Sequence, residues 1–312
     1  MASSSVMRAA AIDIGTNSVL LLIAERRGDE IVAVEERATI TRLGQGVDRT
    51  RRLSTEASER TLRCLGTYAE LVRGSGAEVL DVVGTSALRD ARGSEAFLSD
   101  AESLLGTRPQ IIDGAEEALL SFEGALSGLA LDGAVSVCDI GGGSTELIVG
   151  SVAGSTLGRI ARSVSLDVGS VRLFERHVKS DPPARPELAK VHSELEAALA
   201  SVPTPPRDAA LVGVAGTVTT LAAIELGLAE YDAARIHGAR LTRRAIEDLA
   251  ERLAQIPLEE RKRLRGLDPE RADVIVVGAE IAAALLRWAD ARELVVSSRG
   301  LRWGVVQRRL AP

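Results

Sequence analysis

Between residues 139 and 146 the chain reads DIGGGSTE, three adjacent glycines and two hydroxyl side chains enclosed by two carboxylates. Glycines allow a main chain to approach an anion closely and to adopt positive φ, so that successive N–H groups surround phosphate oxygens. Asp139 and Glu146 stand at the two ends of this turn and could hold a magnesium ion directly or through waters. A plain hairpin needs neither three glycines nor a carboxylate at its strand end. The pattern therefore predicts a phosphate-binding loop, made of Gly141, Gly142, Gly143, Ser144 and Thr145.

A second segment, Asp13 to Ser18 (DIGTNS), has the same order of residues earlier in the chain. The two segments align at an offset of 126 residues, with Ser18 on Ser144 and the apolar residues that follow also matched. Alone, this segment is a weak motif. As the partner of the first by internal repetition, it predicts two similar α/β halves, each with a phosphate loop on one wall of a cleft, where ligands commonly bind.

Two more charged groups are candidates for chemistry. Glu116 and Glu117 begin a predicted helix, where acidic residues are favoured in any case. One of the two could instead face the predicted cleft and act as a general base on a water molecule. Arg89 follows a strand end and could reach a phosphate as a bidentate donor, although a solvated helix arginine fits the sequence equally well.

The composition and the missing motifs exclude several classes of protein. The 312 residues are 46% hydrophobic and 26% charged, as in an ordinary globular protein of about two domains. The net charge of -6 and an aromatic content of 2% argue against binding of nucleic acid polymers. P-loop and Rossmann motifs are absent. Neither a signal peptide nor a run of about 18 apolar residues is found, so we expect a cytoplasmic protein without a membrane partner.

The elements that must position these residues alternate between strands and helices along the chain. Turn residues at 131–133 separate the two halves, so the predicted domains span 1–130 and 131–312. The other predicted strands lie at 31–40, 79–83, 110–113, 210–215 and 293–296, and the predicted helices at 54–72, 95–105, 116–129, 187–201, 242–254, 271–288 and 301–309.

The segments AIDIGTNSVLLLIAE, TRLGQGV, VVGTSALRDA, IDGAEEA, CDIGGGSTELIVG and VGVAGT occur in the order typical of one family. Together they resemble the exopolyphosphatase and guanosine pentaphosphate phosphohydrolase (Ppx/GppA) family over essentially the whole chain. The resemblance implies two ribonuclease H-like domains flanking a cleft, as in the superfamily of acetate and sugar kinases, heat-shock ATPases and actin. This fold agrees with the internal repetition.

The resemblance also implies a role for each matching residue. Glu117, the second glutamate of the EEA run, matches the catalytic base that acts on water. Asp139 and Glu146, with Asp13 at the corresponding strand end, are assigned to a bound magnesium ion, with manganese as the alternative. The residues assigned to phosphate are Thr16, Asn17, Ser18, Arg89, Gly141, Gly142, Gly143, Ser144, Thr145, Gly216 and Thr217.

The expected activity is removal of the terminal phosphate from inorganic polyphosphate. The first alternative is hydrolysis of guanosine pentaphosphate (pppGpp), and the second is a non-catalytic nucleotide-binding regulator of the same fold. Longer members of the family continue into further helical domains, whereas this chain ends soon after Gln307. We therefore expect a preference for short chains, and a homodimer as in the family. Ser297-Ser298-Arg299-Gly300 departs from the Ser-Asp-Gly run of many members.

Overall fold

The computed structural model describes residues 7–28, 30–153 and 156–311. Its contacts divide the chain into two compact units. Unit 1 extends to Leu120 and also contains the chain from Leu301 on, and unit 2 spans Ser121–Gly300. The predicted boundary near residue 131 lies after α5 (Gly114–Leu126), whereas this division falls within α5 and returns the last helix to unit 1.

Unit 1 contains a five-stranded sheet of order β3-β2-β1-β4-β5, in which β1 pairs antiparallel with β2 and parallel with β4. This order is that of a ribonuclease H-like domain, as expected. Its elements are β1 (Arg8–Ile14), β2 (Ser18–Arg27), β3 (Glu30–Ile40), α1 (Val47–Thr50), α2 (Thr55–Ser75), β4 (Val79–Gly84), α3 (Ser86–Asp90), α4 (Glu95–Leu105), β5 (Gln110–Ile111), the first half of α5 and α13 (Leu301–Leu310).

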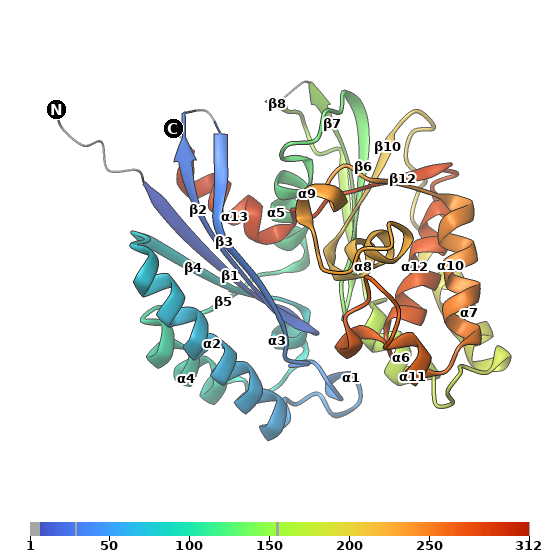
Figure 1. Ribbon diagram of the computed structural model, residues 1–312, viewed down its shortest axis with the longest axis horizontal. Coiled ribbons are helices and arrows are strands. Elements are labelled where there is room, and N and C mark those ends of the chain that lie inside the picture. The colour runs from blue at the N-terminus through green and yellow to red at the C-terminus, as the bar shows by residue number, and fades with distance from the viewer. Residues whose placement is uncertain (1–6, 29, 154–155, 312) are drawn as a thin grey trace. The chain divides into compact units, whose positions relative to one another are not determined.

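Alternate residues of β1 enter different cores, because successive side chains of a strand point to opposite faces of the sheet. Ala10, Ile12 and Ile14 pack with the apolar residues of α2 and α4. Ala9 and Ala11 pack with the apolar residues of α13. Figure 1 shows α2 and α4 together on one face of this sheet. The last helix thus belongs to unit 1 because it covers the second face of β1.

A buried arginine fastens α13 to this sheet. Arg302 donates hydrogen bonds to the carbonyl oxygens of Leu21 and Arg37, at 3.2 and 3.0 Å, and pairs with the Glu36 carboxylate at 2.6 Å. Sequence reasoning placed this helix in the second domain, since a contact between chain ends so far apart leaves no local pattern.

Unit 2 repeats the arrangement, with strands in the order β11-β12-β10-β6-β7-β8 and with β9 also paired to β7. Its elements are β6 (Gly133–Ile140), β7 (Thr145–Ala153), β8 (Thr156–Leu157), β9 (Arg162–Leu166), α6 (Ser170–His177), α7 (Arg185–Leu199), β10 (Ala210–Val214), α8 (Ala215–Glu225), α9 (Ala233–Ile236), β11 (Arg240–Thr242), α10 (Arg243–Gln255), α11 (Leu258–Arg261), a 3-10 turn (Pro269–Arg271), α12 (Ile275–Trp288) and β12 (Glu293–Val296).

The repetition is confirmed at the level of strand register. Ile14 pairs with Val19 across β1 and β2, and Ile140 pairs with Thr145 across β6 and β7, which is the predicted offset of 126 residues on both strands. In each unit a parallel strand follows on the other side of the first, β4 beside β1 and β10 beside β6. The α/β fold with two similar halves is thus confirmed.

Helix α12 is the centre of the core of unit 2, packed against α7, α8 and α10. Its one buried carboxylate, Glu280, accepts a hydrogen bond from His192 of α7 at 2.8 Å. That hydrogen bond raises the pKa of His192 above 6.5. The pair therefore joins two helices and depends on the protonation of one imidazole.

The pair predicts a pH dependence of stability. Because the folded state raises the pKa of His192, its contribution is fully present below pH 6.5 and is lost as the pH rises through the folded pKa. Urea unfolding of wild type and His192→Gln at about pH 5.5 and about pH 8.5 measures it, on either side of the free imidazole pKa. We expect the variant to lose more stability at the lower pH. An equal loss at both values would show that the imidazole is held neutral.

Candidate active site

The phosphate loop of unit 2 is a tight turn between β6 and β7. Gly141 N–H donates to the Ser144 carbonyl at 3.0 Å, and a Cβ on Gly141 would lie 3.0 Å from that same oxygen. Glycine suits this position because the backbone of Ser144 approaches closely, and Gly141 does not adopt positive φ. The corresponding turn of unit 1 has the same closure, from Gly15 N–H to the Ser18 carbonyl at 3.0 Å.

The segment Gly169–Arg172 supports the unit 2 loop from one side. The N–H groups of Ser170 and Val171 donate to the carbonyls of Gly141 and Gly142, at 3.0 and 2.9 Å. The buried Arg172 donates from Nε to the Gly143 carbonyl at 2.6 Å. Because N–H and C=O of a trans peptide point in opposite directions, carbonyls fixed on this side turn the N–H groups of the loop to the other side. The loop is thereby arranged to bind an anion.

Both hydroxyl residues of this loop, Ser144 and Thr145, are buried. Thr145 donates its hydroxyl to the Val168 carbonyl at 2.6 Å. Since a hydroxyl has one O–H donor, Thr145 cannot donate to a phosphate while this bond exists, and its effect is to hold the loop against the Gly169 segment.

The carboxylates Asp139 and Glu146 lie directly opposite each other on β6 and β7, so their side chains share one face of the sheet. Each is fixed by a serine: Ser121 donates to Asp139 at 2.5 Å and Ser165 donates to Glu146 at 2.7 Å. Burial raises the pKa of Asp139, and the Ser121 hydrogen bond acts against this. A bound cation would favour the ionised form of both.

Magnesium fits this pair by chemistry, because two carboxylates supply hard oxygen donors. In the described part of the chain, no group of three or more His, Cys, Asp or Glu side chains is arranged to hold a metal. Waters and phosphate oxygens would therefore complete the coordination, as is usual for magnesium. Asp13 lies in unit 1 on β1, opposite Leu20 and beside Val83, the position that Asp139 has on β6.

The phosphate loop of unit 1 is supported in a similar way. Thr16 and Asn17 are buried, and their carbonyls accept hydrogen bonds from the N–H groups of Gly44 and Arg42, at 2.8 and 2.9 Å. A Cβ on Gly44 would overlap the Thr16 side chain. The predicted site residues Thr16 and Asn17 are thus held by the segment that follows β3, which carries the TRLG motif, and Ser18 pairs with Ile40 of β3.

Glu117 and Arg89, both predicted from the sequence, form an ion pair in unit 1. Arg89 Nη1 lies 2.5 Å from Glu117 Oε2 and 3.0 Å from the Ile112 carbonyl oxygen. Glu117 is buried at 8% exposure, whereas Glu116 is exposed. Asp113 accepts hydrogen bonds from the N–H groups of Ala115 and Glu116 at the start of α5, which sets the orientation of that first turn. Of the two glutamates, Glu117 is therefore the one held in a defined place.

Gly216 and Thr217 stand at the start of α8, directly after β10. The residue before them, Ala215, has a φ of 72°, a conformation rare in residues other than glycine and typical of functional sites. The Arg271 guanidinium occupies the space where a Cβ on Gly216 would lie. Burial lowers the pKa of Arg271, and Asp268 acts against this.

Sequence reasoning missed Arg271 and Arg172 as parts of these loops. Both lie in arginine-rich surroundings without a motif, so no spacing distinguished them from surface arginines.

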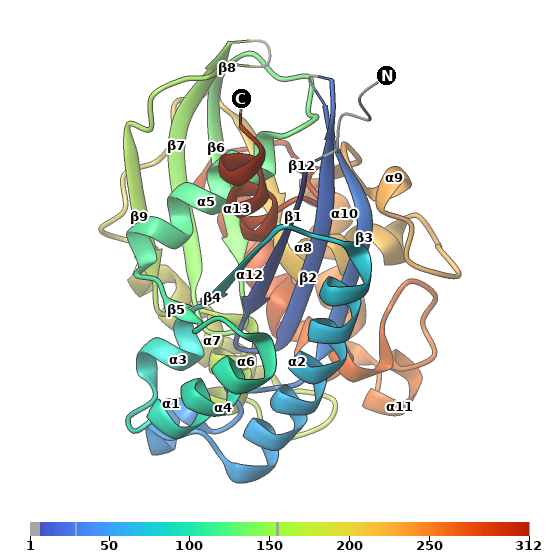
Figure 2. The ribbon, with the colours of Figure 1, turned by 90° about the vertical axis from the view of Figure 1, so that its left-hand side faces the viewer.

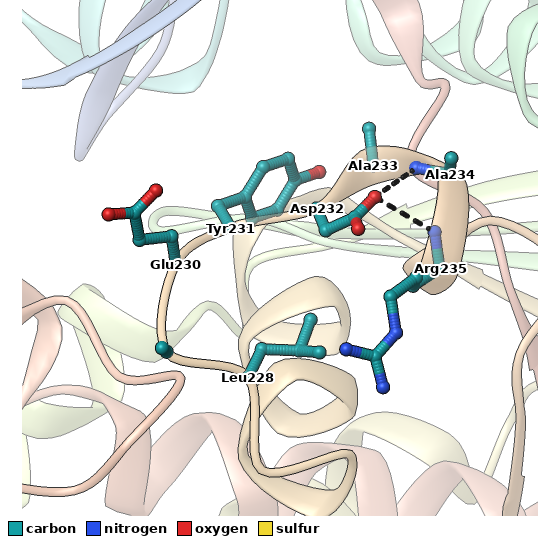
Figure 3. Close-up of a pocket in the computed structure, with 8 residues that line it drawn as sticks. Leu228, Glu230, Tyr231, Asp232, Ala233, Ala234 and Arg235 are labelled. Carbon is teal, nitrogen blue, oxygen red and sulfur yellow. Dashed lines mark hydrogen bonds between the residues drawn. The ribbon is translucent and has the colours of Figure 1, made fainter.

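A pocket of about 610 Å³ lies elsewhere in unit 2, beside α9 (Figure 3). It is lined by residues 228–235, none of which was predicted as a site residue. Tyr231 projects from this segment with 60% of its surface exposed, and Asp232 caps α9 through the N–H groups of Ala234 and Arg235. The lining of this pocket includes the aromatic ring of Tyr231, the carboxylates of Glu230 and Asp232, and the guanidinium of Arg235.

Among the described residues, no helix is both long and apolar enough to span a bilayer.

Comparisons with known proteins agree with the predicted family. The model of the Ppx/GppA phosphatase family matches residues 22–311. The chain is 40% identical to exopolyphosphatase 2 of Mycobacterium tuberculosis, over 96% of this chain and 98% of that protein. The crystal structure of the Aquifex aeolicus family member superposes with a TM-score of 0.81 at 34% identity, covering 98% of each chain. An exopolyphosphatase-like protein superposes with a TM-score of 0.90 at 33% identity, covering 97% and 99%. The chain belongs to the Ppx/GppA phosphatase family.

Proposed function

We propose that the chain is an exopolyphosphatase, which hydrolyses the terminal phosphoanhydride bond of inorganic polyphosphate with the help of magnesium. The observation that carries this proposal is the buried Glu117 carboxylate held by Arg89. A protein that only binds nucleotides has no need for a base at this position. The name of the mycobacterial relative and its coverage of both chains support the same activity.

In this reaction the chain supplies positioning and charge, as in phosphoryl transfer generally. The N–H groups of Gly142, Gly143 and Ser144 bind the oxygens of a phosphate, while that of Gly141 closes the turn. Glu117 orients a water molecule and takes its proton as the oxygen attacks phosphorus and the bond to the bridging oxygen breaks. Arg89 holds Glu117 through Nη1, and its remaining guanidinium N–H groups can reach a phosphate oxygen.

Asp139 and Glu146 would hold magnesium, with manganese as the alternative ion. Bound there, the ion would neutralise charge on the phosphate oxygens. The metal roles of Asp139, Glu146 and Asp13 stay predictions. So do the homodimer, the cytoplasmic location and the preference for short chains.

The experiment that tests the function is phosphate release by purified protein from triphosphate, long polyphosphate, pppGpp and ATP, with magnesium, with manganese or with EDTA. Release from polyphosphate that stops with EDTA supports the proposal. No release from any of the four substrates, with one of them still bound tightly, would favour the nucleotide-binding regulator instead.

The alternative substrate pppGpp is favoured by one observation, the exposed ring of Tyr231 in the pocket beside α9. This ring is a surface on which a base could stack, and its hydroxyl is close enough to Arg271 to influence the pKa of that guanidinium. A guanine-binding pocket predicts that Tyr231→Ala raises KM for pppGpp about tenfold, the loss of one stacked base. KM for polyphosphate should stay the same. A pppGpp activity unaffected by Tyr231→Ala would exclude the pocket as its base site.

A further inference from the structure

Four exposed arginines, Arg49, Arg51, Arg52 and Arg92, gather at the end of α1 and just after α3 in unit 1. We call them the arginine track. The N–H of Arg92 donates to the Arg51 carbonyl at 2.8 Å, which joins the two segments. Figure 2 shows α1 and α3 side by side in this unit. Residues far apart in the sequence thus form one basic surface.

The segment 42–51, which leads into the arginine track, has an unfavourable backbone conformation at its first and last residues. Arg42 and Arg51 have φ values of 52° and 55°, in the left-handed region that favours glycine. Both are fixed by main-chain hydrogen bonds, from Arg42 N–H to the Asn17 carbonyl at 2.9 Å and from Arg51 N–H to the Val47 carbonyl at 2.8 Å. Such strained residues cluster at ligand-binding segments, because the surroundings must hold them in place.

The charges of the track are poorly balanced. Arg51 approaches Asp90 at 3.9 Å, a loose contact, and the side chains of Arg49, Arg52 and Arg92 make no ion pair or hydrogen bond within residues 7–28, 30–153 and 156–311. Asp48 and Asp90 are the acidic residues of α1 and α3. Some exposed arginines elsewhere have close partners, such as Arg108 with two glutamates and Arg309 with Asp81. Because the net charge of the protein is -6, an anion is attracted to this local excess of positive charge and not to the surface as a whole.

The track continues from the candidate active site of unit 1. Arg89, which holds Glu117, lies on α3 directly before Asp90, and Arg92 follows two residues later. Arg92 therefore lies three residues beyond Arg89 in the chain, and its N–H joins this segment to Arg51. The ligand that suits such a row is a linear anion with a charge on every unit. A nucleotide, whose charges are clustered at one end, cannot use the whole row.

We propose that the arginine track binds the phosphates that follow the terminal one in a polyphosphate chain. This inference rests on the proposed exopolyphosphatase function and adds a subsite to it. Affinity should rise with chain length until the track is filled, and it should then stay constant. Fork-shaped guanidinium groups suit phosphate oxygens, and several such contacts in a row make binding strongly dependent on salt.

The test compares the double variant Arg52→Gln/Arg92→Gln with a matched control, Arg207→Gln/Arg244→Gln. The control removes two exposed arginines of unit 2 that lie outside the track. Values of kcat and KM are measured for triphosphate and for linear polyphosphates of increasing length. We expect the track variant to raise KM for long chains about tenfold, with a smaller rise for triphosphate and with kcat within about twofold. The control should match wild type.

Binding is measured separately, with long polyphosphate and with Glu117→Gln in each background. The slope of log K against log salt concentration should fall by about one to two in the track variant, since each arginine on a phosphate contributes slightly less than one. Arg52→Lys/Arg92→Lys should restore most of the affinity, because it keeps the charge.

The outcomes separate the two proposals. Unchanged KM and salt slope in the track variant, with active wild type, would overturn the subsite and leave the function intact. An equal loss in the control would also overturn it, because bulk charge would then explain the binding. A wild type that releases no phosphate from any polyphosphate would overturn the function, and the salt slope would still decide whether the track binds the polymer.

Discussion

Glu117→Gln should lower kcat for polyphosphate hydrolysis by about 10² to 10⁴-fold, the usual contribution of a positioned general base. The amide has the shape of the carboxylate, and its oxygen can still accept the hydrogen bond from Arg89. What is lost is the ability to take a proton from water. KM should therefore change by no more than about threefold, because binding of the phosphates depends on other residues.

The chain provides a matched control in the neighbouring residue, Glu116. It has the same chemistry and lies on the same helix turn, but it is exposed. Glu116→Gln should keep both kcat and KM, as measured by steady-state phosphate release. A Glu116→Gln variant as inactive as Glu117→Gln would show that the whole helix start, and not one carboxylate, is required. Full activity in Glu117→Gln would remove it as the base.

The choice between these two glutamates shows what the sequence alone could not decide. Both stand in the first turn of a helix, where any carboxylate is favoured, so residue type and position are equivalent. The choice depends on the orientation of α5, which Asp113 sets at its start, and on Arg89 as a partner 28 residues away. The resemblance to the family indicated Glu117 before the geometry did.

The repeated hairpin was predictable because it leaves a pattern in the residues themselves. Strand register preserves the spacing, so Asp13 and Asp139 occupy equivalent places on β1 and β6. The division into units was harder. α13 belongs to unit 1 through the apolar face that packs on Ala9 and Ala11, and an amphipathic helix does not state which sheet it will cover.

The supports of the two phosphate loops were also beyond sequence reasoning. Gly169–Arg172 and Thr41–Gly44 act mainly through main-chain N–H groups, which every residue except proline possesses. The remaining signal is an isolated glycine in each segment. Its meaning becomes clear only when the neighbouring backbone is known.

Gly169→Ala should abolish most activity, because the added Cβ would lie closer than 3.0 Å to the carbonyl of Gly142 and the backbone of Gly143. Neither neighbour is a flexible side chain that could move away. The loop must therefore shift from Gly169–Arg172, and the hydrogen bonds of Ser170 and Val171 to its carbonyls are stretched. Once these carbonyls are no longer fixed, the N–H groups on the other side lose their arrangement around phosphate.

We expect kcat/KM for polyphosphate to fall by about 10²-fold or more, since displacement by about 1 Å at a reacting group has that effect. Gly74→Ala is the matched control: Gly74 lies in the last turn of α2, and a Cβ there has open space. It should keep full activity and gain at most about 0.5–1 kcal/mol of stability, because alanine favours the helix. Circular dichroism and urea unfolding show whether Gly169→Ala is folded. A folded Gly169→Ala variant with normal kcat/KM would mean that the loop binds no phosphate in the arrangement seen here. Loss of activity that reverses at high polyphosphate concentration would assign the defect to binding, as the supported loop requires.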